Sequence, residues 1–199
     1  MRRTTVLLAI LTTSVFSNTE FKFAKNYFHN GGVNTAQIQK IMNDDIYFQN
    51  GNQFLQNPSM MSNVTVDTKD PEDKNAPSKM VQTSLPNWPK ALEQFKKSVE
   101  LHNNPVSAYQ GLHIIKTAYG KNYQLKYFSS FSEVLYNNEK NICEAYIDFG
   151  ETLEKGYYRK KDLKRAYQVY TEGLEVENCK KGWHLNILSA KQWNLRKYK

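Results

Sequence analysis

Residues 143–179 read CEAYIDFGETLEKGYYRKKDLKRAYQVYTEGLEVENC, and this stretch decides the fold. Ala145, Phe149 and Leu153 recur at helical spacing on one face, and a second apolar face follows in the later half of the stretch. The pattern predicts two amphipathic helices joined by a short loop. A helical hairpin of this kind cannot bury its apolar face alone, so it needs further helices stacked against it, as in a helical solenoid.

Two glycines, Gly150 and Gly173, lie inside these apolar faces, where residues of higher helix propensity are normal. Glycine inside a helix indicates that another part of the chain comes close to its backbone. We therefore expect tight packing at both positions.

The spacing within this stretch resembles one Sel-1-like repeat, a relative of the tetratricopeptide repeat. The matching residues are Ala145, Phe149-Gly150, Leu153, Gly156, Asp162, Arg165-Ala166, Val169-Tyr170 and Gly173, and a partial second match lies at Lys90-Ala91, Gln94-Phe95, Lys97 and Ser98-Val99. The loop departs from the family pattern, because it reads Gly156-Tyr157-Tyr158-Arg159 where the family prefers a second glycine and a valine. The resemblance covers roughly residues 88–199 and implies an all-α fold, a short α-solenoid that works by binding other proteins.

The beginning of the chain has the outline of a secretory signal peptide. Arg2 and Arg3 precede an apolar run from Val6 to Phe16, and Ser17 suits the last position before a cleavage site. The alternative is a retained membrane anchor, but the run is shorter than the roughly 20 apolar residues that span a bilayer. We therefore expect export, with a mature protein that is periplasmic or secreted.

Four segments follow from the hydrophobic pattern. They are a signal peptide at 1–17, an N-terminal helical segment at 18–56, a flexible linker or long loop at 57–86 and a helical repeat domain at 87–199. The N-terminal segment has an aromatic stripe that stops at Gly31-Gly32, and a second helical run that is expected to break near Gly51. The third segment loses helical periodicity and is rich in polar residues and proline, which favours a loop. The last segment predicts helices of about 10–15 residues.

Cys143 and Cys179 are the two cysteines of the chain. A single cysteine pair in an oxidising compartment favours a disulfide. The two residues flank the helical hairpin, whose ends meet, so a bond between them is geometrically reasonable and would hold the repeat together. The alternative is a catalytic or redox thiol, but the chain has no Cys-x-x-Cys motif.

The sequence has no recognisable pattern for catalysis or for cofactor binding. Its four histidines are scattered, without metal-ligand spacing, and no Ser-x-x-Lys or glycine-rich phosphate loop occurs. We therefore expect a protein that is not an enzyme and that binds no metal or cofactor. The formal net charge of +8 favours acidic partners or anionic surfaces. No nucleic-acid motif accompanies this charge, so nucleic acid is not an expected partner.

The best candidates for partner binding are Tyr157, Tyr158, Arg159, Lys160 and Lys161, because aromatic and cationic residues replace the small residues of the family loop. The alternative is an ordinary solvated turn. The leading hypothesis is an exported scaffold that mediates protein–protein interaction in the cell envelope, for instance as an accessory of a motility or secretion apparatus. It could also contact an anionic wall or lipid surface. The second hypothesis is a cell-wall or β-lactam-binding protein with weak hydrolase activity, and the third is a membrane-tethered adaptor.

Overall fold

The computed structural model describes residues 22–56, 62–68, 79–119 and 125–199, so the expected signal peptide lies outside the described residues. The N-terminal elements are α1 (Lys22–His29), α2 (Ala36–Asp44), α3 (Ile46–Gln56), β1 (Ser62–Thr68) and β2 (Lys79–Leu85). The later elements are α4 (Trp88–His102), α5 (Pro105–Ile114), the π-helical turn η2 (Ile115–Tyr119), α6 (Leu125–Asn138), α7 (Cys143–Lys155), α8 (Leu163–Glu175), η4 (Glu177–Cys179), α9 (Gly182–Asn194) and η5 (Arg196–Tyr198).

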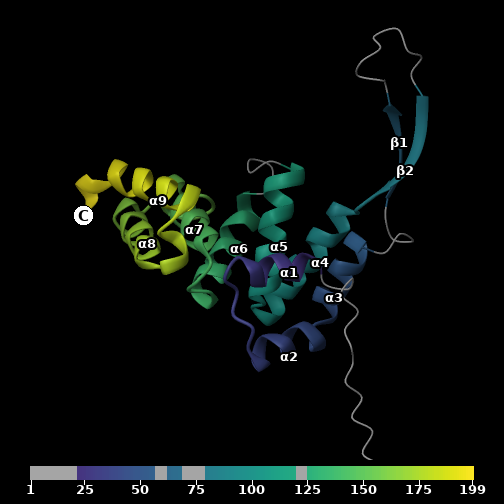
Figure 1. Cartoon of the computed structure of the whole chain (residues 1–199), viewed down its shortest axis with the longest axis horizontal. Helices are drawn as coiled ribbons and strands as arrows, with labels where there is room; N and C mark the ends of the chain where they lie inside the picture. The colour runs from purple at the N-terminus through teal and green to yellow at the C-terminus, as the bar shows by residue number, and fades with distance from the viewer. Residues whose placement is uncertain (1–21, 57–61, 69–78, 120–124) are drawn as a thin grey trace, which may run out of the picture.

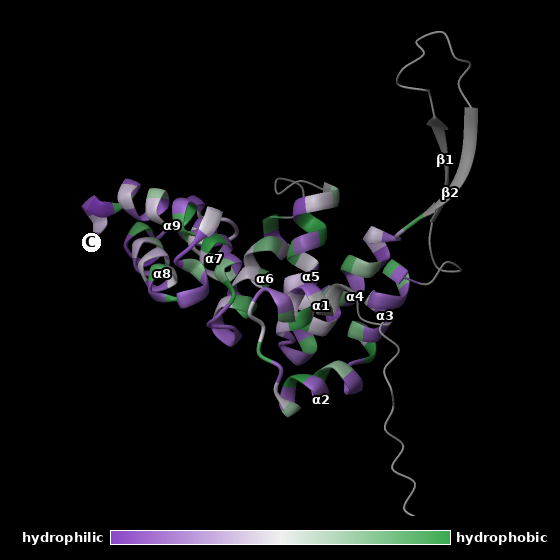
Figure 2. Ribbon diagram, viewed as in Figure 1, coloured by the Kyte–Doolittle hydropathy of each residue, from purple (hydrophilic) through white to green (hydrophobic). Residues whose placement is uncertain are grey.

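The body of the molecule is a row of helices in sequence order, from α3 at one end to α9 at the other (Figure 1). Each helix of this row packs against the next one in the chain, and α1 lies against α5. Hydrophobic and hydrophilic residues are interspersed along the helices, as expected for amphipathic segments with one buried side (Figure 2). The predicted all-α class is confirmed for this body, whereas the repeat relationship between its helices stays a prediction.

Two helices of the expected repeat domain, α4 and α8, begin at residues whose side chains cap them. The side chain of Asn87 accepts a hydrogen bond from the backbone N–H of Lys90 at the start of α4, and Pro89 occupies the first turn. Asp162 caps α8 in the same way, through the N–H of Arg165 at 2.8 Å. From α4 to α9 the helices contain 10–15 residues, which confirms the predicted lengths.

The N-terminal segment is helical as predicted, but its break is elsewhere. The predicted break near Gly51 is wrong, because Gly51 lies inside α3. A Cβ atom at this position would lie 2.5 Å from the ring of Phe95, so glycine serves the contact between α3 and α4. The chain instead breaks at Asp45, between α2 and α3.

Asp45 is buried and joins three helices through its carboxylate. Its Oδ1 accepts hydrogen bonds from the N–H groups of Tyr47 and Phe48 at 3.0 Å each, in the first turn of α3. Its Oδ2 accepts from the hydroxyl of Ser98 in α4 at 2.5 Å and from the side chain of Asn104, before α5, at 2.9 Å. A buried carboxylate is tolerated here because each oxygen has two donors.

The prediction of an unstructured linker at 57–86 is wrong for two parts of that segment. Ser62–Thr68 and Lys79–Leu85 form an antiparallel β-hairpin, in which Val66 pairs with Val81. This ribbon projects from the α3–α4 end of the row (Figure 1). The polar composition concealed it, because a strand alternates with a period of two and needs only a few β-branched residues.

The α7–α8 hairpin has the predicted disulfide. Cys143, the first residue of α7, is bonded to Cys179 in η4, with 5.4 Å between the Cα atoms. Both residues are buried. The prediction of a structural disulfide is thereby confirmed, and the bond closes a sequence separation of 36 residues around the hairpin.

The two glycines in the apolar faces permit close side-chain packing. A Cβ atom at Gly150 would lie 2.2 Å from the ring of Tyr170, which is fully buried against it. A Cβ atom at Gly173 would lie 2.8 Å from the Cβ of Tyr146. The expected close approach is therefore real, and side chains of the facing helix occupy the space.

Candidate functional sites

The turn between α7 and α8 carries all five residues that the sequence singled out. Gly156 ends α7 in the left-handed conformation, with φ of 74°, and Tyr158 follows with φ of 50°. Asp162 then donates its N–H to the carbonyl of Leu153 at 3.0 Å and caps α8 with its side chain. Both ends of the turn are thus held by backbone contacts to the hairpin itself.

Two of the five predicted residues are engaged inside the fold. Tyr157 is half-buried and packs edge-to-face against Phe128 of α6, with 6.1 Å between the ring centroids. Arg159 reaches the carboxylate of Glu133 with two nitrogens and lies over the ring of Phe149, 5.2 Å from its centroid. These contacts give Tyr157 and Arg159 a structural role, in which they position the turn.

The other three predicted residues face solvent. Tyr158 is 72% exposed, and Lys160 and Lys161 are both exposed. Among the described residues, neither lysine has a carboxylate within ion-pair distance. We call Tyr158, Lys160 and Lys161 the turn surface. Its two cations and its aromatic ring are free to contact a partner.

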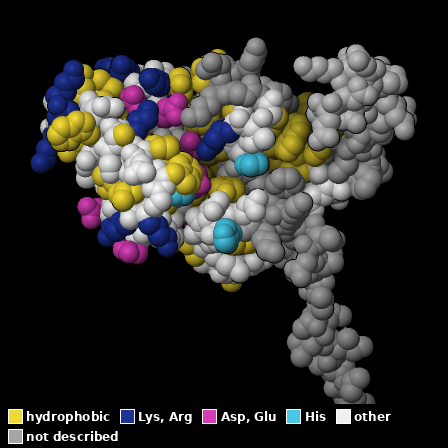
Figure 3. All heavy atoms as spheres, turned by 45° about the horizontal axis from the view of Figure 1, so that its top comes forward, with side chains coloured by type: hydrophobic (Ala, Val, Ile, Leu, Met, Phe, Trp, Pro, Cys, Tyr) yellow, Lys and Arg dark blue, Asp and Glu magenta, His cyan; other side chains and the backbone are white. Residues whose placement is uncertain are grey.

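An open groove of about 580 Å³ borders the turn surface. Its lining residues are Lys160, Lys161, Asp162, Leu163, Lys164 and Tyr198. Lysine and arginine side chains gather at this α8–α9 end of the molecule (Figure 3). The groove therefore presents mainly positive charge, with Asp162 as the counter-charge at its edge.

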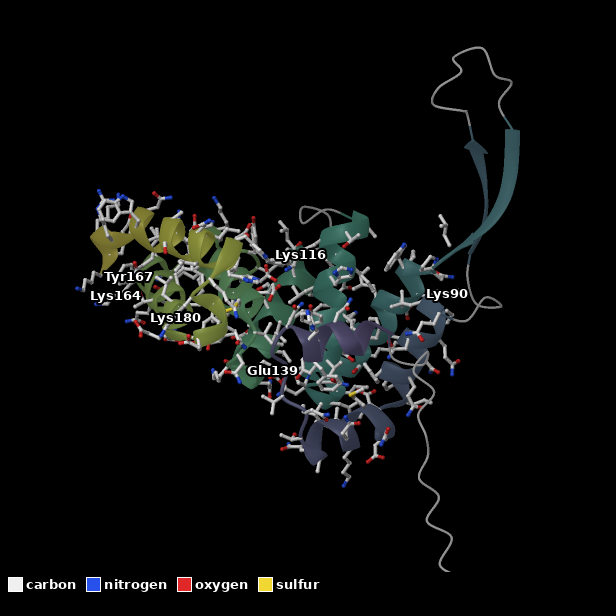
Figure 4. All side chains as sticks on the ribbon, viewed as in Figure 1. Lys90, Lys116, Glu139, Lys164, Tyr167 and Lys180 are labelled. Atoms are coloured by element: carbon white, nitrogen blue, oxygen red, sulfur yellow. A yellow bond between two sulfur atoms is a disulfide. The ribbon has the colours of Figure 1, made fainter. Side chains whose placement is uncertain are left out.

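Two other basic residues of the α8 region are engaged in internal ion pairs. Arg165 pairs with Glu172 at 2.8 Å and donates to the hydroxyl of Tyr136 at 2.7 Å. Lys180 pairs with Glu177 at 3.3 Å. In Figure 4, Lys164 and Lys180 both lie at the α8 end of the molecule. Lys160, Lys161 and Lys164 are exposed and have no carboxylate within ion-pair distance among the described residues, so their positive charge is available to a partner.

The sequence did not reveal a second concave site, which lies between α5, α7 and α9. We call it the α5–α7–α9 pocket; it has a volume of about 160 Å³. Its lining residues are Tyr109, Leu112, His113, Lys116, Leu135, Glu144, Asp148 and Trp183. Lys116 lies on the side of the α5 region that faces α7 and α9 (Figure 4). No sequence motif marks this pocket, because its residues come from separate helices.

The charged groups of this pocket are partly paired. Lys116 forms an ion pair with Asp148, whose side chain is only 3% exposed. Glu144 Oε1 lies 3.2 Å from His184 Nε2, within ion-pair distance, but the two groups are not aligned for a hydrogen bond. Glu144 Oε2 is buried and has no hydrogen-bond partner among the described residues.

The pocket also shifts the pKa values of two titratable groups in its wall. Burial raises the pKa of the Tyr109 hydroxyl, and a hydrogen bond from Asn30 partly opposes this rise. The negative charges of Glu144 and Asp148 raise the same pKa further. Burial lowers the pKa of His113, and the positive charge of Lys116 lowers it further. Near neutral pH, Tyr109 thus keeps its proton and the His113 ring is uncharged.

The described part of the chain contains neither a cluster of metal-ligating residues nor a membrane-spanning helix. Its histidine, cysteine and acidic side chains form no group of three that could hold a metal ion. Within the same ranges, every helix falls short, in length or in hydropathy, of what a membrane-spanning segment needs.

Comparison of the chain with protein-family models, with curated protein sequences and with solved structures finds no match. The similarity to Sel-1-like repeats therefore rests on the sequence pattern alone.

Proposed function

We propose that this protein is an exported helical scaffold, of a type resembling Sel-1-like repeats, that binds a protein partner in the cell envelope or outside the cell. Catalysis has no part in this proposal. The observation that carries it is the exposure of Tyr158 on an immobilised turn, beside two lysines that lack ion pairs.

The turn is pre-organised for binding. A non-glycine residue with φ of 50° is strained, by about 1–2 kcal/mol, and persists only where its surroundings impose the conformation. Here Gly156, the Arg159–Glu133 ion pair and the Asp162 cap fix both sides of Tyr158. A rigid aromatic residue loses little conformational freedom on binding, which favours affinity.

The chemistry of the turn surface indicates the type of partner. Two lysines and the adjacent Lys164 favour an acidic surface, and the ring of Tyr158 favours an apolar contact within it. The disulfide is compatible with an oxidising compartment, which supports a setting outside the cytoplasm. We therefore propose an acidic segment of an envelope or extracellular protein as the partner.

Site-specific photo-crosslinking tests this proposal. A photoreactive phenylalanine analogue replaces Tyr158 in the full chain, expressed in its native cell, and crosslinked proteins are identified by mass spectrometry. The matched control places the analogue at Leu101, which is 63% exposed on α4. We expect a specific partner from position 158 and none from position 101.

A variant series then measures affinity for that partner. Replacing Tyr158, Lys160 and Lys161 together with alanine is expected to weaken binding about tenfold or more, or about 1.4 kcal/mol. Replacing the exposed Lys40 and Lys126 with alanine removes two positive charges elsewhere and is expected to leave affinity unchanged. Equal affinity of the triple variant and the wild type, with unchanged helical content, would place the binding surface elsewhere.

A further inference from the structure

The α5–α7–α9 pocket has a buried carboxylate oxygen without a donor. A carboxylate removed from water normally accepts hydrogen bonds on both oxygens, and an unsatisfied buried oxygen costs free energy. Glu144 Oε2 is such an atom, and its neighbour His184 is not aligned to donate to the same carboxylate. Among the described residues, Glu144 has no lysine or arginine within ion-pair distance. The pocket therefore lacks one cationic donor.

The other charges of the pocket do not supply this donor. Lys116 is engaged by Asp148, so these two charges offset each other. The lowered pKa of His113 keeps its ring neutral near neutral pH. With these groups accounted for, the carboxylate of Glu144 gives the lining of the pocket an excess of negative charge.

An exposed tryptophan completes the site. Trp183 lines the pocket and is 54% exposed, and its ring lies against the ring of His184 at an angle of 33°, with 3.8 Å between centroids. Tryptophan is the best aromatic surface for an ammonium or guanidinium group, and it also packs well against an aliphatic chain. A ligand with a cationic end and an apolar stem can therefore place the cation at Glu144 and the stem against Trp183.

The size of the pocket limits the ligand. Its volume of about 160 Å³ is smaller than the roughly 300–1,000 Å³ typical of sites for small molecules and cofactors. It is suited to one amino-acid side chain inserted from a protein surface. We infer that the α5–α7–α9 pocket is a binding site for a single lysine or arginine side chain of a protein partner, with Glu144 as the charge acceptor and Trp183 as the aromatic wall.

This site is separate from the turn surface proposed above, because none of the turn-surface residues lines the pocket. It also has the opposite charge preference. Loss of binding at the turn would leave the pocket unaffected, and the reverse also holds, so the two inferences can fail independently.

NMR titration of the full-length, disulfide-bonded protein with single-residue probes tests the inference. The probes are N-acetyl-arginine amide and N-acetyl-lysine amide, with N-acetyl-citrulline amide as the uncharged analogue and N-acetyl-glutamate amide as the anionic one. We expect the two cationic probes to shift the Trp183 indole N–H and the backbone amides of Glu144 and Asp148, with dissociation constants in the millimolar range. The citrulline and glutamate probes should bind at least tenfold more weakly.

Variants assign the effect to the pocket. Glu144→Gln keeps the shape of the side chain, and we expect it to lower the affinity for the arginine probe at least tenfold. Glu175→Gln removes the charge of an exposed residue on α8 and should leave this affinity unchanged. If Glu144→Gln fails to fold, Trp183→Ala changes an exposed residue of the same pocket instead. We expect this variant to reduce the probe-induced shifts of the Glu144 and Asp148 amides. Equal binding of citrulline and arginine, tighter binding of glutamate, or no shift in the millimolar range would overturn the inference.

Discussion

Arg159 and Glu133 form a two-point ion pair that connects the α7–α8 turn to α6. The Nη1 and Nη2 atoms of Arg159 lie 3.3 and 2.5 Å from the two carboxylate oxygens, and its Nε lies 3.3 Å from the hydroxyl of Ser129. The arginine side chain is 24% exposed, so solvent screens this pair less than a fully exposed one. The contact fixes the direction in which the turn leaves α7.

Arg159→Ala should therefore destabilise the fold. We expect the free energy of unfolding to fall by about 1 kcal/mol, because the bidentate pair and the contact with Phe149 are lost together. Urea unfolding measures the change. The control is Lys160→Ala, one residue away and exposed, which should stay within about 0.5 kcal/mol of wild type. Equal stability of the two variants would show that the ion pair does not stabilise the fold.

Tyr158→Gly should separate stability from binding. Glycine adopts positive φ without strain, and the gain of about 1–2 kcal/mol is partly offset by the greater freedom of the unfolded chain. We expect a net stabilisation of up to about 1 kcal/mol, together with weaker partner binding. Thermal unfolding measures the first effect. Tyr157→Gly is the matched control and should destabilise the protein, because it removes the packing against Phe128. Destabilisation by Tyr158→Gly would contradict the assignment of strain.

Gly150→Ala should reverse the usual effect of alanine in a helix. Alanine normally stabilises a helix interior by about 0.5–1 kcal/mol relative to glycine. Here the new methyl group meets the ring of Tyr170, which cannot easily move because its hydroxyl donates to Glu154 at 2.9 Å. We expect a loss of about 1–3 kcal/mol in chemical denaturation.

A double-mutant cycle checks that cause. Tyr170→Leu removes the ring. It should lower the free energy of unfolding less in the Gly150→Ala background than in the wild type. Additive costs would show that the two residues do not interact.

The helical body could be predicted from the sequence because the patterns that indicate its helices are local. The period of 3.6 in 143–179 and the single cysteine pair each lie within one or two helices. The β-hairpin was not predicted, because its strands have no helical period and are rich in polar residues. Its alternation of Val64 and Val66 was the available signal.

The candidate functional sites were harder to predict from the sequence, because their arrangement depends on contacts between helices. The turn was located correctly, but its division into packed and exposed residues depends on Phe128 and Glu133, which lie on α6. The lining of the α5–α7–α9 pocket also includes residues of η2 and α6, and the partners Lys116 and Asp148 are 32 residues apart. No spacing rule within a single helix connects them.

The disulfide should contribute several kcal/mol to stability. On the chain-entropy model, a loop of 36 residues corresponds to about 3–4 kcal/mol. Replacing both Cys143 and Cys179 with alanine should therefore lower the melting temperature by roughly 6–16 °C, at about 2–4 °C per kcal/mol. Differential scanning calorimetry of oxidised protein and of the variant gives the difference. Free thiols in denatured protein, purified without reductant, would contradict the bond.

Glu154 should make stability depend on pH in the acidic range. Burial by itself raises its pKa, but hydrogen bonds from Lys191 and Tyr170 outweigh burial and lower the pKa below its usual value of 4.5. A depressed folded-state pKa contributes stability above 4.5, and this contribution is lost as pH falls through the folded-state value. Glu154→Gln should therefore cost more stability at about pH 7 than at about pH 3 in urea unfolding. A constant difference between variant and wild type would contradict this linkage.

The hydrogen bond between Tyr27 and Glu139 joins residues 112 positions apart, and it sets an order of folding. Glu139 also accepts from the N–H of Val33 at 3.2 Å, so α1 and the segment after it both depend on this distant carboxylate (Figure 4). The other helices pack mainly against neighbours in the chain, and such local contacts form early. During synthesis, α1 emerges before the elements it docks on, because α5 and the residues after α6 follow later in the chain. Among the described helices, α1 is therefore one of the last to reach its final place.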